Sequence, residues 1–512
     1  MLLAGVVAAL AHPPWGFAPG LFGFALIFAL VDRTGSDRPI RSAFFRGWLA
    51  GCGYFAVALF WLLQPFFIDA KEQGWMAPFA VALVDMGMAL FWGAAAAVYG
   101  LLAGKSVMRV ILFAGALSAF EWLRGHLLTG FPWDLPGEAW RAGSPPSQVA
   151  AAVGAYGLTW ITLTLFSVPV VVRQGRAGKL LLGAAVISAA TIWIAGAMRL
   201  SSPYRYSPHG PWVRIVQANV RQETKYDLRL FRSIVDRYVA LTALPSPHQV
   251  EIIVWPEGAV PAPLEDYLSD GTWTARAIAA ALRPGQTLLV GGYRWARGPR
   301  GGDVAFNSLA AVRRSGGGVA LLALYDKYRL VPFGEFMPLD SLASRLGVKQ
   351  FVHVGGGFAP GPRPRPLRIE GLPAAQPLIC YESLFPGFTR QGAALSGVRP
   401  AWIVNVSNDA WFGTGSGPRQ HLNLASYRAI EEGLPMVRAT PTGISAVIDA
   451  FGRVAPGKAL GIGAFGVIDA PLPPALPPTL FSRFGDAPFF LMLILSAACA
   501  RWAEVIQARP RQ

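Results

Sequence analysis

Eight apolar runs dominate the sequence and limit what the chain can fold into. Most of them are long enough to cross about 30 Å of hydrocarbon as a helix, which rises about 1.5 Å per residue. The composition agrees, because 53% of the residues are hydrophobic and only 14% are charged, as is typical of a membrane protein. We therefore predict a multi-helix transmembrane bundle of about eight helices. The runs cover residues 2–11, 17–31, 47–68, 77–103, 108–123, 147–172, 179–198 and 487–503.

The first run is short and has two interpretations. Its Ala9-Leu10-Ala11 end resembles the small-residue cleavage site of a signal peptide. However, no Lys or Arg precedes the run, whereas a signal peptide carries positive charge there. We favour a membrane helix that is joined to the next run by a turn at His12-Pro13-Pro14, with a cleavable signal as the alternative.

Basic residues gather in every second connection between the runs. The other connections are acidic or mixed, with Asp69 and Glu72 after the third run and Asp134 and Glu138 after the fifth. Because basic loops stay in the cytoplasm, the alternation places the N-terminus in the cytoplasm and the long segment after the seventh run on the opposite side. The basic connections carry Arg33, Arg38, Arg41, Arg46, Lys105, Arg109, Arg173, Arg176 and Lys179.

Three parts follow from this pattern. Residues 1–199 are expected to form N-terminal transmembrane helices, 200–485 a periplasmic domain, and 486–512 a C-terminal transmembrane helix with a cytoplasmic tail. In the periplasmic part, β-rich runs alternate with helical patterns, which is typical of an α/β domain. The β-rich runs are 213–217, 252–255, 287–290, 378–381, 402–406, 435–439 and 444–448, and the helical patterns are 227–243, 273–283 and 419–432.

Two kinds of partner are disfavoured by the composition. The net charge of +16 would suit nucleic acid, but the basic residues form no patch or recognition motif, and anionic lipid headgroups explain the sign more simply. The six His residues show no metal-ligand spacing, and the three Cys residues include no close pair. We predict no nucleic-acid partner, no metal and no cofactor.

Three segments of the predicted α/β domain each end a β-rich run with a reactive side chain: Val254-Trp255-Pro256-Glu257, Tyr325-Asp326-Lys327 and Leu378-Ile379-Cys380. A thiol attacks as thiolate, so it needs a base to take its proton and a cation to stabilise its charge. Glu257 and Lys327 could serve Cys380 in these ways. Taken singly, each residue is as well explained by a surface carboxylate, a solvated charge or core packing.

In this order, the three segments resemble the Glu, Lys and Cys motifs of the nitrilase superfamily. With seven apolar runs before the domain and one after it, nearly the whole chain is similar to the membrane-bound branch of that superfamily, the apolipoprotein N-acyltransferases. Supporting segments lie at residues 331–335, 407–413, 121–124 and 130–133.

The resemblance implies a nitrilase-like α-β-β-α sandwich and assigns the same roles to Glu257, Lys327 and Cys380. It makes Glu335 an additional acidic group that positions the base or gates entry. It also implies that Tyr381, Glu382 and Trp411 line the acyl and amine pocket.

Two positions depart from the family pattern. Tyr226 stands where the family often has Trp on a mobile loop, and Pro441 stands where it usually has Asn. Proline lacks a backbone N–H, so local bonding at position 441 is expected to differ. A Cys–His pair involving His421 is a further, less favoured arrangement, because the Glu-Lys-Cys set already supplies a base.

By resemblance, the enzyme moves a fatty acyl chain from a membrane phospholipid, through a cysteine thioester, to the α-amine of the N-terminal diacylglyceryl-cysteine of lipoproteins. It is expected to be a multi-pass protein of the bacterial inner membrane. The first alternative is a membrane-tethered amidase that hydrolyses a small amide with the same three residues. The second is a non-catalytic membrane scaffold that retains a nitrilase-like domain.

Overall fold

The computed structural model describes residues 1–512 except 34–38, 203–209, 299–300, 339–356 and 509–512. The chain divides into two compact units, which are described separately. The helical unit comprises Met1–Pro203, Gly415–Gly433 and Pro477–Gln512, and the α/β unit comprises Tyr204–Thr414 and Leu434–Leu476.

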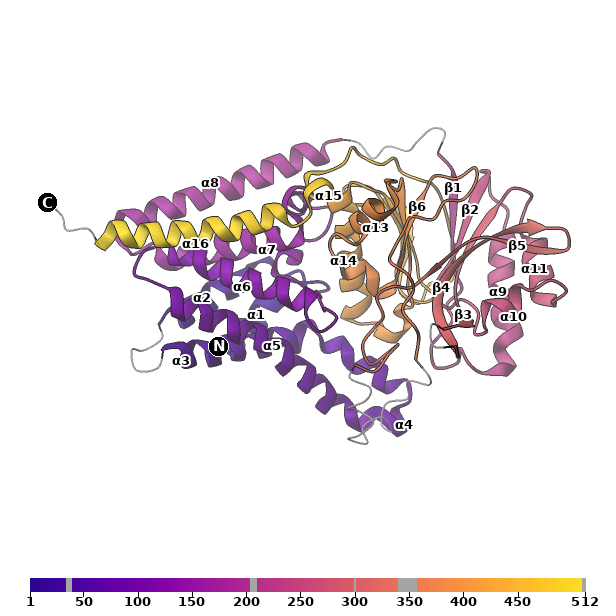
Figure 1. Ribbon diagram of the computed structural model, residues 1–512, viewed down its shortest axis with the longest axis horizontal. Coiled ribbons are helices and arrows are strands. Elements are labelled where there is room, and N and C mark those ends of the chain that lie inside the picture. The colour runs from indigo at the N-terminus through magenta and orange to yellow at the C-terminus, as the bar shows by residue number, and fades with distance from the viewer. Residues whose placement is uncertain (34–38, 203–209, 299–300, 339–356, 509–512) are drawn as a thin grey trace. The chain divides into compact units, whose positions relative to one another are not determined.

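Each of the predicted apolar runs overlaps a helix (Figure 1). Among the described residues, four helical segments are long and apolar enough to cross a membrane, or five if a pair bent by 50° is one span. The prediction of about eight spans is therefore not confirmed. The helices are α1 (Leu2–Ala9), α2 (Gly23–Asp32), α3 (Pro39–Ala58), α5 (Ala77–Leu102), α6 (Arg109–His126), α7 (Ala150–Ser167), α8 (Gly175–Leu200) and α16 (Ala487–Ala508).

The difference between the predicted number of spans and the number of candidate spans has a physical reason. The helices α1 and α2 contain 8 and 10 residues, which reach only about 12–15 Å at helical rise. The helix α6 carries Arg109, Glu121 and Arg124, all of them buried. Glu121 and Arg124 form an ion pair, and the indole of Trp92 donates a 2.5 Å hydrogen bond to Glu121. Paired charges of this kind are tolerated inside a helical bundle but not against lipid.

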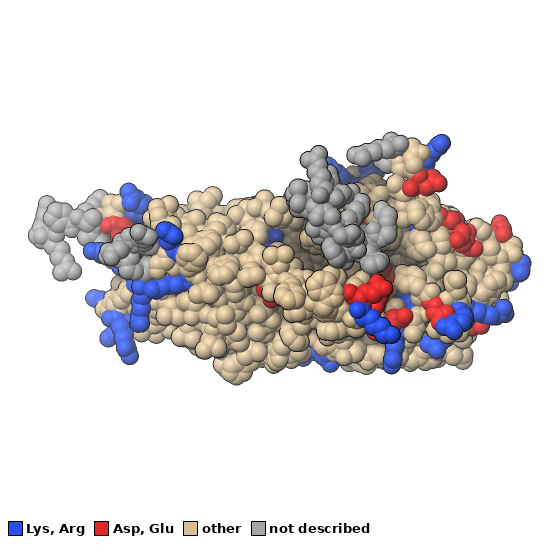
Figure 2. Space-filling model, turned by 90° about the horizontal axis from the view of Figure 1, so that it is seen from below, with Lys and Arg blue, Asp and Glu red and all other residues tan. Residues whose placement is uncertain are grey.

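The outer helices present apolar side chains. On the face shown in Figure 2, the helical unit has a wide surface with few charged side chains that ends in a group dominated by Lys and Arg. Such a surface suits the hydrocarbon of a bilayer, and the basic end suits anionic headgroups. The exposed apolar residues of α5, α8 and α16 include Phe79, Leu83, Ile187, Trp193, Leu491 and Ile494.

The helix α14 (Ser416–Glu432) lies far from the other helices in sequence but groups with the helical unit. Its Arg428 is buried between two carboxylates, 3.2 Å from Oε1 of Glu138 and 2.9 Å from Oε2 of Glu431. Tyr427 donates a 2.6 Å hydrogen bond to the carbonyl of Trp140. The ring of His421, on the same helix, packs 5.6 Å from the ring of Trp133.

The α/β unit contains two sheets whose faces pack together. Strands β1, β2 and β3 are parallel in the first sheet, and β6, β7 and β8 are parallel in the second. The first sheet has the order β11-β1-β2-β3-β4-β5, with β1 (Trp212–Gln217), β2 (Val250–Trp255), β3 (Thr287–Arg297), β4 (Asp303–Ser315), β5 (Gly318–Asp326) and β11 (Gly466–Pro471). The second has the order β10-β9-β8-β7-β6, with β6 (Ala375–Ile379), β7 (Trp402–Val406), β8 (Met436–Ala439), β9 (Ser445–Ile448) and β10 (Val454–Leu460).

Side chains alternate between the two faces of these strands, as the period of two requires. In β2, Ile252 and Val254 belong to the core between the sheets, whereas Ile253 and Trp255 belong to the outer core. The outer core packs against α9 (Phe231–Ala243), α10 (Leu264–Leu268) and α11 (Trp273–Ala281) (Figure 1). On the second sheet, Gly392 of α13 (Phe388–Ser396) lies against Gln376 of β6. The predicted sheets with helices outside them are confirmed.

The buried ion pairs of α14 generate a stability prediction. Burial raises the pKa of Glu138 to about 8, and Arg428 opposes that rise. Replacing Arg428 with Met would leave Glu138 and Glu431 without their cation, so we expect a loss of about 3–5 kcal/mol of stability. The measurement is the melting temperature of detergent-purified protein, with the exposed Arg419 of the same helix replaced by Met as control. Equal melting temperatures for the two variants would contradict this account.

Candidate active site

Three predicted site residues follow strands of the α/β unit. Lys327 comes directly after β5 and Cys380 directly after β6, while Glu257 comes two residues after β2. Strands β2 and β5 belong to the first sheet and β6 to the second. Because the inner faces of the two sheets share one core, side chains from all three segments converge.

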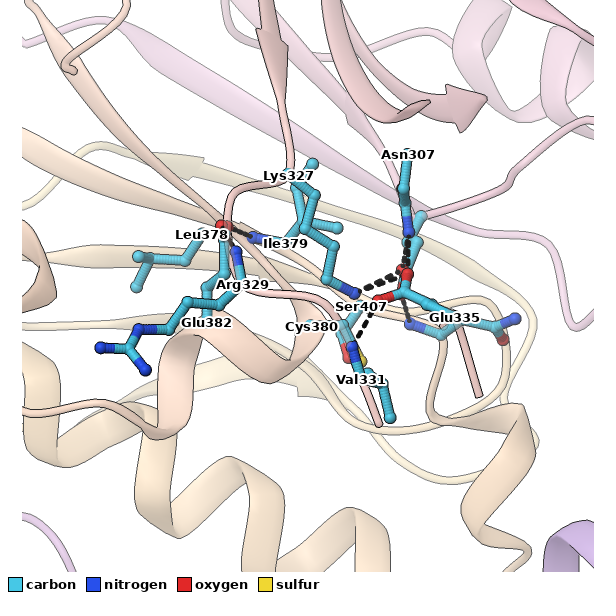
Figure 3. A network of polar contacts seen from close by, with 12 residues as sticks. Asn307, Lys327, Arg329, Val331, Glu335, Leu378, Ile379, Cys380, Glu382 and Ser407 are labelled. Carbon is cyan, nitrogen blue, oxygen red and sulfur yellow. Dashed lines mark hydrogen bonds and ion pairs between the residues drawn. The ribbon is translucent and has the colours of Figure 1, made fainter. Parts of the chain in front are cut away.

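The ammonium of Lys327 lies between two carboxylates. Its Nζ atom is 2.9 Å from Oε1 of Glu335 and 3.5 Å from Oε1 of Glu257, and only 1% of the lysine is exposed (Figure 3). Burial alone would lower the pKa of Lys327, but the charges of Glu335 and Glu257 outweigh it and raise that pKa. Lys327 is therefore a permanent cation at neutral pH.

Hydrogen bonds fix both carboxylates. The side-chain amide of Asn307 donates to Oε1 of Glu257 and to Oε1 of Glu335, each at 2.7 Å. The second oxygen of Glu257 accepts from the backbone N–H of Asn408 at 2.7 Å, and that of Glu335 accepts from Val331 at 2.8 Å. Each carboxylate thus has one oxygen facing the lysine and one held by the backbone.

Cys380 begins a 3-10 turn and has a φ of +50°, a left-handed conformation that is strained for a residue with a side chain. Burial raises the pKa of its thiol and the charge of Glu257 raises it further, whereas Lys327 and a hydrogen bond with Ser407 lower it. The raised pKa favours the protonated form of the thiol at neutral pH. Figure 3 shows Cys380, Ser407 and Lys327 converging on the same space.

Glu382 connects the cysteine turn to the lysine segment. It is fully buried, and its Oε1 accepts hydrogen bonds from the hydroxyl of Tyr325 and the N–H of Tyr328, both at 2.8 Å. Its Oε2 accepts from the N–H of Ile379, also at 2.8 Å. Burial raises the pKa of Glu382 to about 7, although these hydrogen bonds lower it. Both oxygens of the Glu382 carboxylate therefore accept hydrogen bonds from groups of the protein itself.

The other predicted residues lie around this cluster with different exposure. Tyr381 is buried and its ring lies 5.0 Å from that of Phe385, edge to face. Trp411 is 40% exposed and Tyr226 is 60% exposed. Pro441 lies in the turn between β8 and β9, where Ser445 Oγ accepts a 3.0 Å hydrogen bond from the N–H of Thr440.

Sequence reasoning missed Asn307, which lies on β4 and binds both carboxylates. The only signal was a polar Asn307-Ser308 pair inside an apolar stretch. In the described part of the chain, no group of three or more His, Cys, Asp or Glu side chains is placed to hold a metal ion.

Two models of known protein families match the sequence. Residues 4–168 match the family model "Apolipoprotein N-acyltransferase N-terminal domain", and residues 212–475 match "Carbon-nitrogen hydrolase". Together with the two-sheet fold and the apolar helices, these matches define a membrane-bound member of the carbon-nitrogen hydrolase superfamily.

Full-length relatives narrow the assignment. The chain is 52% identical over 513 residues to a protein of Caulobacter vibrioides named apolipoprotein N-acyltransferase, covering 100% of this chain and 94% of that protein. It is 37% identical over 524 residues to one of the same name from Bradyrhizobium diazoefficiens, covering 99% and 95%. The chain belongs to the apolipoprotein N-acyltransferase family, so the resemblance inferred from the motifs is confirmed.

Among solved structures, a mutant amidase of the nitrilase superfamily from Nesterenkonia AN1 matches with a TM-score of 0.35. It is 19% identical and covers 52% of this chain and 93% of that one.

The electrostatics of Cys380 generate a second prediction. Because burial raises the pKa of the thiol, its alkylation by iodoacetamide should keep accelerating above pH 9, where an ordinary thiol levels off. Replacing Lys327 with Met removes the cation that lowers this pKa, so the rate at pH 8 should fall at least about tenfold, the effect of one pKa unit. Peptide mass spectrometry measures the rate, and free N-acetylcysteine reacted under the same conditions is the reference for an ordinary thiol. An unchanged rate at Cys380 would contradict the geometry.

Proposed function

We propose that the chain transfers a fatty acyl group from a membrane phospholipid to the α-amine of the N-terminal diacylglyceryl-cysteine of lipoproteins. The acyl group is carried between them as a thioester on Cys380. The observation that carries the proposal is the buried cluster in which Glu335 and Glu257 hold the ammonium of Lys327 beside the thiol. Membership of the apolipoprotein N-acyltransferase family supports the identity of the two substrates.

In the first step, Glu257 takes the proton of Cys380, and the sulfur attacks the carbonyl carbon of a phospholipid ester. Lys327 and a backbone N–H beside Cys380 stabilise the oxyanion that forms. The carbon–oxygen bond of the ester then breaks, and Glu257 returns its proton to the leaving oxygen. The products are a lysophospholipid and an acyl thioester.

In the second step, the lipoprotein amine attacks the thioester carbonyl. Glu257 takes a proton from the attacking nitrogen, and the carbon–sulfur bond breaks as the amide forms. The thiolate that leaves is stabilised by Lys327 and regains the proton from Glu257. Glutamate, lysine and cysteine thus return to their starting states.

The surrounding residues have supporting roles in this proposal. Glu335 holds Lys327 in place, at 2.9 Å, while Glu257 lies farther from the ammonium, at 3.5 Å, and exchanges the proton. Glu382 fixes the cysteine turn relative to the lysine segment through its hydrogen bonds. Tyr381, Trp411 and Tyr226 line the path of the acyl chain and the amine.

The membrane gives this chemistry its setting. We place the protein in the bacterial inner membrane with the α/β unit in the periplasm, as the alternation of basic connections favours. Both substrates are anchored in the bilayer, so an enzyme confined to the same surface gains effective concentration. Apolar surroundings also exclude water, which would otherwise hydrolyse the thioester.

The test is the covalent intermediate. Purified protein incubated with a phospholipid of defined chains should gain the mass of one acyl group on Cys380, detected by intact-protein mass spectrometry. Cys380→Ala should gain none, and Glu257→Gln should form the adduct roughly 10²–10⁴-fold more slowly, the usual contribution of a general base. The exposed Glu370, changed to Gln, is the matched control and should behave as the unmodified chain.

Two outcomes would contradict the proposal. An adduct that persists in Cys380→Ala would place the nucleophile elsewhere. No adduct, together with turnover of small amides, would show that the same residues serve a membrane-tethered amidase.

A further inference from the structure

A second buried lysine, Lys225, lies beside the candidate site and has no part in the proposed reaction. Only 4% of it is exposed. A Cβ atom placed on Gly258, the residue after Glu257, would stand 2.6 Å from its Nζ atom. The ammonium therefore occupies space that any side chain at position 258 would fill.

Lys225 differs from Lys327 in its partners. Lys327 contacts two carboxylates. Within the described residues, no hydrogen bond or ion pair reaches Nζ of Lys225. This atom lies 5.7 Å from the centroid of the Tyr226 ring. Burial lowers the pKa of Lys225 to about 8, even though the charge of Glu257 raises it. A buried cation that no carboxylate contacts is costly, so an anionic partner from outside the protein would relieve that cost.

The segment that carries Lys225 is connected to the site. Gln222, one turn earlier, accepts a 2.9 Å hydrogen bond from the side chain of Asn408. The backbone N–H of the same Asn408 donates to Glu257. The chain from Gln222 to Lys225 is thus held at a defined place next to the proposed base.

We propose that Lys225 binds the phosphodiester of the phospholipid donor while Cys380 attacks its ester. This inference rests on the function proposed above. In a glycerophospholipid the ester carbonyl and the phosphodiester are a few bonds apart, so an anion site beside Glu257 is within reach of the same molecule. Lysine binds phosphate as a point charge, without requiring one geometry. Lys225 would thereby select donors that carry a phosphate next to the ester.

The test compares three acyl donors with identical chains: a phospholipid, a diacylglycerol and a neutral p-nitrophenyl ester. The readout is the ratio of the rate of Cys380 acylation by phospholipid to the rate with each neutral donor, measured by intact mass. Lys225→Met should lower both ratios roughly ten- to a hundredfold, since a hydrogen bond to a charged group contributes about 1.5–3 kcal/mol. Lys225→Arg should restore most of the loss. Lys458→Met, in β10 of the same unit, is the matched control and should leave the ratios unchanged.

Several outcomes would overturn the inference. Equal losses with all three donors would make Lys225 a structural residue or a modulator of Glu257, and no loss with any donor would exclude it from donor binding. If Lys225→Met fails to fold, the inference is tested with the unmodified enzyme. Equal rates of Cys380 acylation by phospholipid and by diacylglycerol would then show that phosphate is not recognised. Acylation of the unmodified enzyme by the p-nitrophenyl ester but by neither lipid would instead contradict the proposed function itself.

Discussion

The burial of one ammonium between two carboxylates is the interaction on which the α/β unit depends. Lys327 is 1% exposed, and an unpaired charge at that depth would cost several kcal/mol. Glu335 and Glu257 offset this cost because Asn307 also donates to the Oε1 atoms that face the lysine, and two backbone N–H groups satisfy the Oε2 atoms. The cluster therefore requires β4, the segments after β2 and β5, and the loop after β7 to be in place together. The geometry of the proposed catalytic residues and the folded structure therefore depend on the same contacts.

The thiol is held by a different sheet from the charges, and this explains the place of Glu382. Cys380 follows β6 of the second sheet, whereas Lys327 follows β5 of the first. Packing of two apolar faces is not directional, so it does not by itself set the distance between the two residues. Hydrogen bonds are directional, and Glu382 accepts them from the backbone on both sides. The strained φ of Cys380 is compatible with this arrangement because the turn around it is fixed.

Sequence predicted those parts of the molecule in which local pattern and structure agree. Reactive residues that end β-rich runs, such as Glu257 and Cys380, were found because strand ends of α/β domains meet at one edge. Asn307 was missed because β4 and β5 form a long antiparallel hairpin whose apolar and polar residues give no clear break. The predicted number of membrane spans was not confirmed, because apolar content does not distinguish a helix buried by protein from one that faces lipid. The position of α14 was also beyond reach, since its burial depends on ion pairs of Arg428 with distant residues.

Lys225 and Lys327 differ in a way that their sequence motifs do not reveal and the structure does. In the sequence both stand in short polar segments, Lys225-Tyr226-Asp227 and Asp326-Lys327-Tyr328, and either could be a solvated charge. In the structure both are buried, but one is surrounded by carboxylates and the other is not. The charge of Lys327 is neutralised by carboxylates of the protein, and in the proposed reaction Lys327 remains an ammonium throughout. A buried ammonium that no carboxylate contacts is costly, and the phosphodiester of the proposed donor lipid would relieve that cost.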